Sequence, residues 1–300
     1  MARIRVATFN VYFFEPVAAI HRVDRSDADL ELIGETIASL DADVLVLQEI
    51  MGFERIDDLL AIASAAAGRD YSVRAGNDYF LASPWNGAGN KVVVAFDSRA
   101  IDLAGFGRVP GSFTERRRPL VAVLDHAESG RRIGVVGVHL KSDDPGYDGG
   151  KSDRRHEECE LIRSWVEGSS AVHEASGLAL PDAWVLAGDC NAVLDNGVLN
   201  PLREVVTLHR PAPLEPEEDH WTTDLDRVVI DHVGTSDAAS IRSSRPPQIV
   251  RFDSHPAVLD AYGPDVRERD WDVVTYESEH SVPRLYRVSD HRPVVAEVDF

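Results

Sequence analysis

Six short stretches of the sequence place polar, mostly ionisable side chains where an apolar run ends or begins. The stretches are TFN, LVLQE, VVGVHL, VLAGDCN, VVIDHV and SDHRPV, and the side chains are Asn10, Glu49, His139, Asp189, Asn191, Asp231, Asp290 and His291. One such residue is ordinary, because Asn and Asp satisfy their own backbone in turns. A lone histidine beside an apolar run is also more often a core residue than a catalyst. Six runs that carry such groups at the same kind of position indicate a shared catalytic edge.

Four of these side chains, those of Glu49, Asp189, Asp231 and Asp290, are carboxylates. Burying them together is costly unless a cation or a hydrogen-bond donor pairs with them. A hard divalent cation such as Mg²⁺ or Mn²⁺, bound through oxygen ligands, relieves their repulsion. Such an ion and a positioned histidine suit the hydrolysis of a phosphate ester, which needs an oriented water and relief of charge on the phosphoryl oxygens.

The elements that must position these residues follow from the hydrophobic pattern. Apolar runs of strand length occur at 4–9, 44–48, 92–96, 120–124, 133–140, 184–188, 227–233 and 293–298. Several are nearly continuous, which predicts strands covered on both faces. Residues 29–40, 55–67 and 152–166 show helical character between them. Two covered sheets with helices outside are the natural packing.

The composition is that of a globular chain with an ample core, at 300 residues and 44% hydrophobic. Without an internal repeat or a break in composition, we expect one domain over 1–300, with a long loop insertion at about 235–289 whose length favours a functional role. The opening residues read as a first strand rather than a signal peptide, and no run is long enough to span a membrane. Cys159 and Cys190 are isolated, so no disulfide framework is indicated and a cytoplasmic location is expected.

The charge balance constrains the partners. A net charge of −20 repels polyanions, so a broad basic face for nucleic acid is not expected. The densest basic cluster is ERRRPL at 115–120. Residues 235–289 intersperse arginines with tyrosines and a tryptophan, which can bind phosphates and stack bases, but they are also rich in Asp and Glu. This segment therefore predicts a short substrate, such as a nucleotide, an oligonucleotide or a small phosphate ester, rather than a long duplex. We expect a monomer without an obligate protein partner or a membrane association.

Taken in order, ATFNV, VLQEI, GVHLKS, AGDCNAV, VIDHV and SDHRPVV resemble the motifs of the endonuclease/exonuclease/phosphatase superfamily, the deoxyribonuclease I-like proteins. The resemblance extends over nearly the whole chain. It implies an α/β fold, a four-layer α/β/β/α sandwich in which two mixed sheets pack face to face with helices outside.

The resemblance also implies roles for the residues that match. Glu49 corresponds to the main metal ligand, with Asn10 and Asp290 beside it. Asp189 and Asn191 stand where the family orients the attacking water and holds the phosphoryl group.

The remaining matches concern proton transfer and the substrate. His291 resembles the catalytic histidine, and Asp231 the carboxylate that fixes its ring. His139 resembles a second histidine that contacts a phosphate oxygen. Arg117 resembles a phosphate-contacting arginine, for which Arg118 is the alternative.

Two features depart from the family pattern. Many relatives carry a second Asn or Asp two residues after the first Asn, where this sequence has Tyr12. The metal shell is therefore expected to be lighter beside Asn10. The interval between Asp231 and Asp290 is also longer than is usual in the family.

These observations predict a Mg²⁺- or Mn²⁺-dependent phosphoesterase that hydrolyses phosphodiester bonds, as a nuclease or a nucleotide phosphodiesterase. Two alternatives stay open. One is a phosphatase of small or lipid-derived phosphates. The other is a non-catalytic binding module on the same fold, against which the intact set of polar residues argues.

Overall fold

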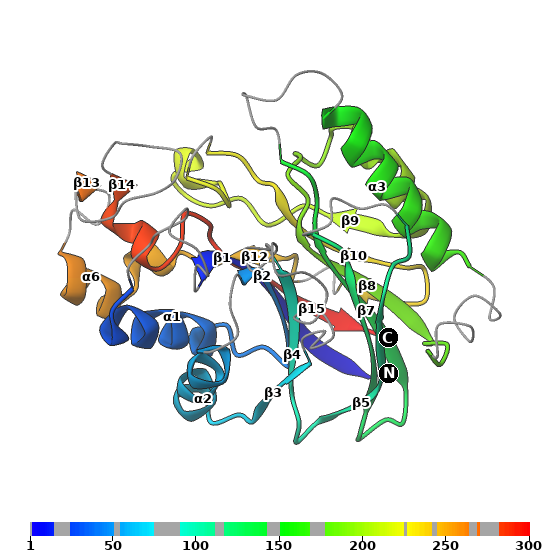
Figure 1. Ribbon diagram of the computed structural model, residues 1–300, viewed down its shortest axis with the longest axis horizontal. Helices are drawn as coiled ribbons and strands as arrows, with labels where there is room; N and C mark the ends of the chain where they lie inside the picture. Colours follow the sequence, from blue (N-terminus) through cyan, green and yellow to red (C-terminus); the bar gives the residue numbers. More distant parts are fainter. Residues whose placement is uncertain are drawn as a thin grey trace, which may run out of the picture.

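Two mixed β-sheets packed face to face form the centre of the protein, and helices cover both outer faces (Figure 1). The computed structural model describes residues 2–14, 25–50, 55–74, 91–111, 117–142, 151–168, 178–224, 227–241, 245–263, 269–270 and 282–300. The four-layer α/β/β/α sandwich predicted from the sequence is confirmed.

The first sheet brings two of the predicted site residues to one edge. Its order is β11-β15-β1-β2-β4-β3, with β12 also paired to β15. The strands are β1 (Arg3–Phe14), β2 (Val44–Ile50), β3 (Tyr71–Arg74), β4 (Lys91–Asp97), β11 (Ser240–Ile241), β12 (Gln248–Ile249) and β15 (Val294–Asp299). β1 and β2 are parallel, and Asn10 is paired with Gln48, the neighbour of Glu49. Asn10 and Glu49 therefore lie at the same edge of the sheet.

The second sheet presents its polar residues at the same end of the sandwich. Its order is β5-β6-β7-β8-β10-β9. The strands are β5 (Ile101–Arg108), β6 (Leu120–His126), β7 (Arg132–His139), β8 (Ala183–Asp189), β9 (Thr207–His209) and β10 (Asp231–Thr235). The parallel pair β7 and β8 places His139 opposite Asp189, and the antiparallel strand β10 starts with Asp231 opposite Asp189.

Helices close both outer faces. α1 (Asp27–Ser39) and α2 (Ile56–Ala67) cover the first sheet, whereas α3 (Lys151–Val166) and the short α5 (Asn200–Val205) cover the second (Figure 1). α1 begins at a capping box in which Ser26 and Asp29 bond each other's backbone N–H groups, which supplies acceptors to otherwise unpaired donors. Among the described helices, none has the length and apolar character needed to cross a bilayer.

Three apolar layers hold the sandwich together. Val135 lies between the two sheets, and its neighbour Val136 packs under α3, as strand alternation requires. Leu47 lies in the third layer, between the first sheet and α1 and α2. Because both faces of the central strands are covered, these strands appear in the sequence as continuous apolar runs.

The strand predicted at 227–233 begins later than the sequence indicates, at Asp231. The backbone N–H of Ile230 donates to Oγ1 of Thr222 rather than to a neighbouring strand. Arg227 also has a positive φ of 50°, which is incompatible with an extended strand. Asp231 is therefore the first residue of its strand, at the edge that also carries Asp189.

The segment 235–289 contains more secondary structure than the loop expected from the sequence. β11 and β12 both pair with β15 and extend the first sheet. The segment also contains η4 (Phe252–Ser254), α6 (Pro256–Tyr262), the pair β13 (Arg269–Asp270) and β14 (Val282–Pro283), and η5 (Arg284–Arg287). Phe252 and Val258 belong to the apolar layer beneath α1. At least this part of the segment therefore contributes to the core, while residues 242–244, 264–268 and 271–281 lie outside the described residues.

Candidate active site

The candidate site lies where the edges of the two sheets meet. Nδ2 of Asn10 donates to Oε1 of Glu49 and to Oδ2 of Asp189, each at 3.2 Å. Nε2 of His139 lies 3.5 Å from Oδ2 of Asp189 and 3.8 Å from Oε1 of Glu49. All four side chains are buried. Residues from four strands of both sheets thus form one polar cluster inside the sandwich.

A strained backbone directs Glu49 into this cluster. Its φ is 59°, and the pairing of β2 with β4 shifts register between Leu47 and Ile50. A positive φ is unfavourable for a residue with a Cβ and is found where the surrounding structure imposes it. The bulge therefore re-aims Glu49 at the cost of regular pairing, as bulges beside active sites often do.

The histidine and its carboxylate form a second, adjacent pair. Nδ1 of His291 donates to Oδ2 of Asp231 at 2.9 Å, and both side chains are buried. Nε2 of the same ring lies 3.9 Å from Oδ1 of Asp290. Two hydroxyl groups hold the backbone of the pair, since Asp231 N donates to Oγ1 of Thr222 and His291 N to Oγ of Ser289. The pair is thus fixed in side chain and main chain.

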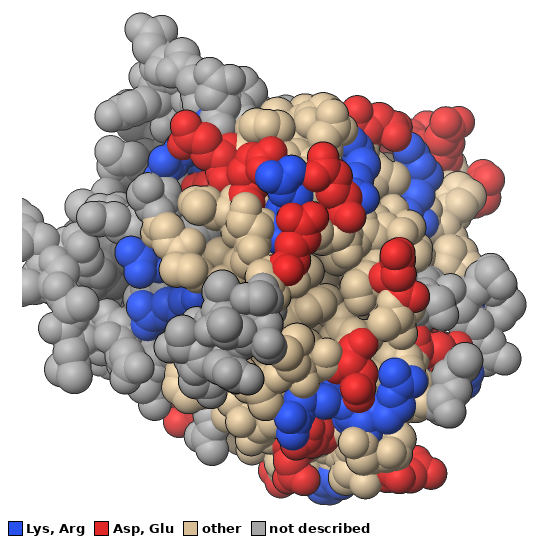
Figure 2. All heavy atoms as spheres, turned by 90° about the vertical axis from the view of Figure 1, so that its right-hand side faces the viewer, with Lys and Arg blue, Asp and Glu red and all other residues tan. Residues whose placement is uncertain are grey.

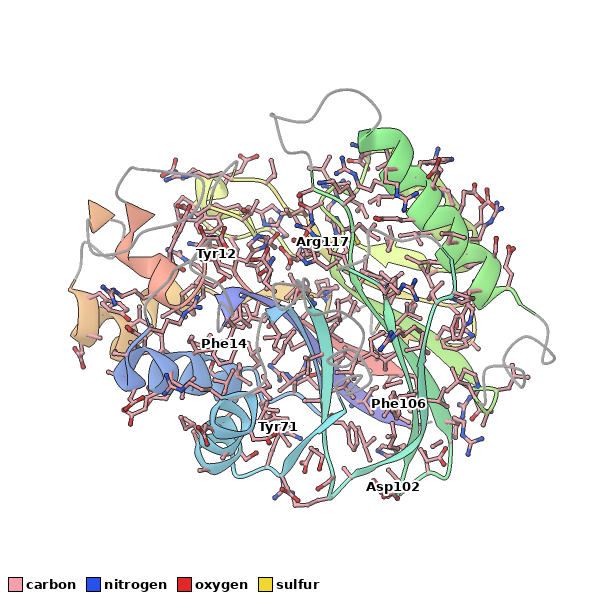
Figure 3. The ribbon with its side chains drawn as sticks, in the orientation of Figure 1. Tyr12, Phe14, Tyr71, Asp102, Phe106 and Arg117 are labelled. Carbon is pink, nitrogen blue, oxygen red and sulfur yellow. The ribbon has the colours of Figure 1, made fainter. Side chains whose placement is uncertain are left out.

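A turn after β8 carries Asn191. Its φ is 48°, its backbone N–H donates to Oδ1 of Asp189 at 2.8 Å, and its Nδ2 donates to the carbonyl of Leu140 at 2.9 Å. Nη1 of Arg117 donates to the same carbonyl at 2.9 Å. The shared acceptor places the Arg117 guanidinium beside the Asn191 amide, while Arg118 is half-buried next along the chain. Figure 3 shows Arg117 and Tyr12 at the catalytic end, well away from Asp102 and Phe106 on β5.

The electrostatics reflect an excess of negative charge. Burial, together with the nearby carboxylate of Asp231, raises the pKa of Asp189 to about 7. Burial raises the pKa of Asp290 to about 7 as well, with Glu49 adding to the effect. Burial alone would lower the pKa of His291, but Asp231 and Asp290 outweigh it and raise that pKa well above its usual range. Shifts of this kind are typical of functional sites.

The donor set fits a hard divalent cation. Oδ1 of Asp231 and Oδ1 of Asp290 are buried and receive no hydrogen bond from the described residues. One potential ligand atom from each of Asp189, Asp231 and His291 lies within 4.8 Å of the others. Acceptor-only oxygens without donors are what Mg²⁺ and Mn²⁺ bind. The assignment of Glu49, together with Asn10 and Asp290, as the ligand set stays a prediction, now with Asp189 and Asp231 close enough to take part.

Some supporting residues have little or no signal in the sequence. Oγ of Ser289 donates to the carbonyl of Asn10 at 2.6 Å and so connects β1 to the segment that carries His291. The only indication of Ser289 in the sequence is its position directly before Asp290 in the SDH motif. Arg25 is more remote, and its guanidinium donates to the carbonyls of Tyr12 at 2.6 Å and Arg287 at 2.6 Å. Nothing in the spacing of the motifs could have located Arg25.

This fold and this cluster together define a phosphoesterase-type α/β sandwich. The chain belongs to the endonuclease/exonuclease/phosphatase family, whose sequence model matches residues 7–291. No curated protein matches the chain.

Several solved structures share the fold. Sphingomyelinase C from Streptomyces griseocarneus superposes with a TM-score of 0.63 at 17% identity, covering 99% of both chains. D. rerio TDP2 complexed with a single-strand DNA product gives 0.62 at 13% identity over 100% of both chains. The mannosyl-6-phosphatase of Bacteroides thetaiotaomicron gives 0.61 at 15% identity, covering 99% of this chain and 100% of that one. The identities are low, so these likenesses concern the fold alone.

Proposed function

We propose that the protein is a Mg²⁺- or Mn²⁺-dependent phosphodiesterase that acts on a short substrate, as a nuclease of oligonucleotide ends or a nucleotide phosphodiesterase. The observation that carries the proposal is the buried pair of His291 and Asp231, joined at 2.9 Å, directly beside the carboxylate of Asp189. A carboxylate-oriented histidine next to a second, separately held carboxylate can position a water and move a proton at the same phosphorus.

The residues divide the chemistry between them. Asp231 holds Nδ1–H of His291, which leaves Nε2 to face the reacting atoms and to hold or release a proton there. Asp189 accepts from Asn10 and from the Asn191 backbone, so its carboxylate has a fixed orientation from which it can align a water. A divalent cation bound by the carboxylates would supply charge neutralisation and orientation of the phosphoryl oxygens.

The charge of the site favours a diester over a monoester. Glu49, Asp189, Asp231 and Asp290 gather at one edge, and Arg117 is the arginine that the shared Leu140 carbonyl fixes there. A phosphodiester carries one negative charge and a monoester up to two near neutral pH, so the diester is repelled less by the carboxylates.

The surface favours a short substrate over a long polyanion. Figure 2 shows the side of the molecule that lies on the right in Figure 1, where described basic and acidic side chains are interspersed rather than separated into bands. The whole chain carries a net charge of −20. Binding along a long duplex would require a row of unopposed cations to contact successive phosphates. A nucleotide or an oligonucleotide end needs only the local cluster at Arg117.

A second candidate substrate is a lipid-derived phosphate ester. Val193, two residues after Asn191, is 41% exposed and is among the few large apolar side chains that the described surface presents. An apolar group at the rim of the site would suit a hydrophobic leaving group. The structural similarity to sphingomyelinase C is compatible with this alternative, although it concerns the fold.

A hydrolysis panel with Mg²⁺ and with Mn²⁺ tests the proposal. The panel contains bis-p-nitrophenyl phosphate, p-nitrophenyl phosphate, a dinucleotide, single- and double-stranded DNA, RNA and sphingomyelin. Turnover of diesters with preference for the dinucleotide and short single strands supports the proposal. Preference for the monoester would instead indicate a phosphatase, and preference for sphingomyelin would indicate an enzyme that acts on lipid-derived phosphate esters. Cation binding without any turnover assigns a binding module. His291→Ala, with His126→Ala at the opposite end of the sandwich as the matched control, shows whether the turnover belongs to this site.

A further inference from the structure

A second buried histidine lies immediately after Asp231 and is not used by the proposed chemistry. His232 is 0% exposed and is the second residue of β10. Successive side chains of a strand point to opposite faces of the sheet. Val233 packs between the two sheets, so Asp231 faces that side and His232 faces the layer beneath α3 and α5. His232 therefore lies behind the catalytic edge, out of reach of the substrate.

The ring of His232 contacts the turn that carries Asn191. Its Nε2 lies 2.8 Å from the carbonyl oxygen of Ala192, and because a carbonyl can only accept, Nε2–H is the donor. On the other side of the turn, Nδ2 of Asn191 donates to the carbonyl of Leu140. The turn between β8 and the following segment is thus held from both sides.

This support matters because the turn is strained. Asn191 has a φ of 48°, in the left-handed region that residues with a Cβ rarely occupy. Such a conformation persists only where neighbouring contacts impose it. Its amide has one N–H engaged by Leu140, which leaves Oδ1 and the second N–H for a ligand. The direction of these two groups depends on the turn, which is held by the bond from His232 to Ala192 and by the bond from the Asn191 backbone to Asp189.

We propose that His232 is a positioning residue that, through its hydrogen bond to Ala192, holds the Asn191 amide in the orientation that contacts the phosphoryl group. The inference rests on the proposed function for the role of Asn191. It differs from an ordinary structural role in a specific way. A merely structural histidine would change stability, whereas a positioning residue changes turnover only as long as Asn191 is present.

Two substitutions of similar chemistry separate these roles. The side-chain amide of glutamine reaches the place of Nε2, and that of asparagine reaches only the place of Nδ1. His232→Gln therefore keeps the donor to Ala192, and His232→Asn loses it. We expect His232→Asn to lower kcat on bis-p-nitrophenyl phosphate by about 10- to 100-fold, as small misplacements of catalytic groups do, and His232→Gln to stay within about threefold of the parent.

The decisive measurement combines these variants with Asn191→Ala. If His232 acts through Asn191, His232→Asn should change kcat by less than about twofold in the Asn191→Ala background, since two residues that act in series are not additive. An undiminished loss in that background, or a glutamine variant as slow as the asparagine variant, overturns the proposal. If His232→Asn does not fold, His232→Leu carries the same expectation.

A control and a second readout make the test independent of catalysis. Thr235→Val, on the same strand, removes a partly buried hydrogen bond to His209 (2.8 Å) away from the site, and should lower Tm without changing kcat. The side-chain amide resonance of Asn191, identified by its loss in Asn191→Ala, should shift in His232→Asn but not in Thr235→Val. An unshifted resonance overturns the positioning role. Absence of hydrolysis in the parent instead overturns the proposed function.

Discussion

Two buried aspartates, at opposite ends of the sandwich, have opposite environments. Asp97 ends β4 and is 3% exposed, and Asp189 ends β8 and is 2% exposed. Asp97 forms ion pairs with Arg99 at 2.7 Å and Arg69 at 3.2 Å, and the hydrogen bonds from Arg99 lower its pKa to about 2. Asp189 has no arginine or lysine ion pair among the described residues, and burial with Asp231 nearby raises its pKa to about 7.

This difference is the one expected between a carboxylate that stabilises the fold and a carboxylate that binds a ligand. A buried carboxylate with its own arginine is satisfied within the fold, and its charge stabilises the native state. A buried carboxylate that faces other carboxylates takes up a proton more readily, and it keeps its charge most easily beside an additional cation. The second arrangement lowers stability in the absence of that cation and is maintained where the ligand is part of the function.

Removal of the cation should give the largest effect. In the proposed mechanism the carboxylates around Asp189 bind a divalent ion, so EDTA should abolish hydrolysis, and Mg²⁺ or Mn²⁺ should restore it. The arginine-paired end of the molecule needs no metal, so the circular dichroism of the chelated protein at room temperature should be unchanged. Glu49→Ala should weaken Mn²⁺ binding in a calorimetric titration. Full activity in excess chelator would contradict the metal-dependent mechanism.

Neutralising one carboxylate at each end should produce two different losses. Asp231→Asn removes the group that orients His291, and should lower kcat by about 10²–10⁴ with little change in Tm. Asp97→Asn removes the carboxylate that Arg99 and Arg69 share, but Arg99 is exposed and Arg69 keeps Asp41 and Asp43. It should therefore lower the free energy of unfolding by about 1–2 kcal/mol while leaving kcat unchanged. Steady-state kinetics and urea unfolding of both variants check this. If Asp231→Asn and Asp97→Asn lowered kcat by similar factors, the two carboxylates would not differ in their roles as proposed.

Much of the fold could be predicted because its central strands are covered on both faces. Runs such as 133–140 are continuous in apolar residues, and the polar groups at their ends mark one edge. Four short strands, β11 to β14, lie in the segment 235–289 that was expected to be a loop, and three described strands outside it were also not predicted. The edge strand β5 is largely half-exposed and contains the glycines of IDLAGFGR, and β3 and β9 are too short to form an apolar run. Edge strands derive their structure from one neighbour and leave a weak pattern.

The candidate site was predictable in its members but not in its supports. The structure brings Asn10, Glu49, Asp189 and the histidines together, as the strand-end pattern indicates. The supports are contacts between residues far apart in the sequence, such as Arg25 with the carbonyl of Arg287. The contact of His232 with Ala192 depends on which face of β10 the ring occupies and on the path of the turn. These are consequences of packing, and no spacing in the sequence encodes them.

The pH dependence of stability should differ between the two ends. An aspartate has a pKa of about 3.9 in an unfolded chain, whereas Asp290 has one of about 7 in the fold. A raised folded pKa stabilises the protein below pH about 4, and this stabilisation is lost as the pH rises through about 7. Asp97, with a lowered pKa, contributes in the opposite sense, and its contribution is lost as the pH falls from about 4 toward 2.

Thermal unfolding of the parent and of Asp290→Asn in EDTA checks this sign. At about pH 4, near the pKa of the unfolded chain, little of this stabilisation has been lost, so the two proteins should melt at similar temperatures. At pH 8 the parent carries a buried charge that the variant lacks, so the variant should melt a few degrees higher. The pKa of Asp290 already includes the attraction of its carboxylate to the charged His291, so the comparison measures the net effect of the Asp290 charge. A difference in Tm that does not change with pH would show that Asp290 titrates normally.

The smallest predicted effect concerns the arginines that the sequence left as alternatives. Nη1 of Arg117 donates to the carbonyl of Leu140, which also accepts from Asn191, and this bond aims the guanidinium at the site. A hydrogen bond from a charged group is worth about 1.5–3 kcal/mol, so Arg117→Ala should raise KM for a phosphodiester about tenfold or more, with a smaller change in kcat. Arg117→Lys keeps the charge but lacks the planar guanidinium that can bond the Leu140 carbonyl and a phosphate at the same time. Its KM should therefore lie between those of the parent and Arg117→Ala. Arg118→Ala is the matched control, expected within about twofold of the parent. If Arg118→Ala instead shows the larger rise in KM, the phosphate contact belongs to Arg118, and the bond of Arg117 to Leu140 serves only to hold the turn at 139–141.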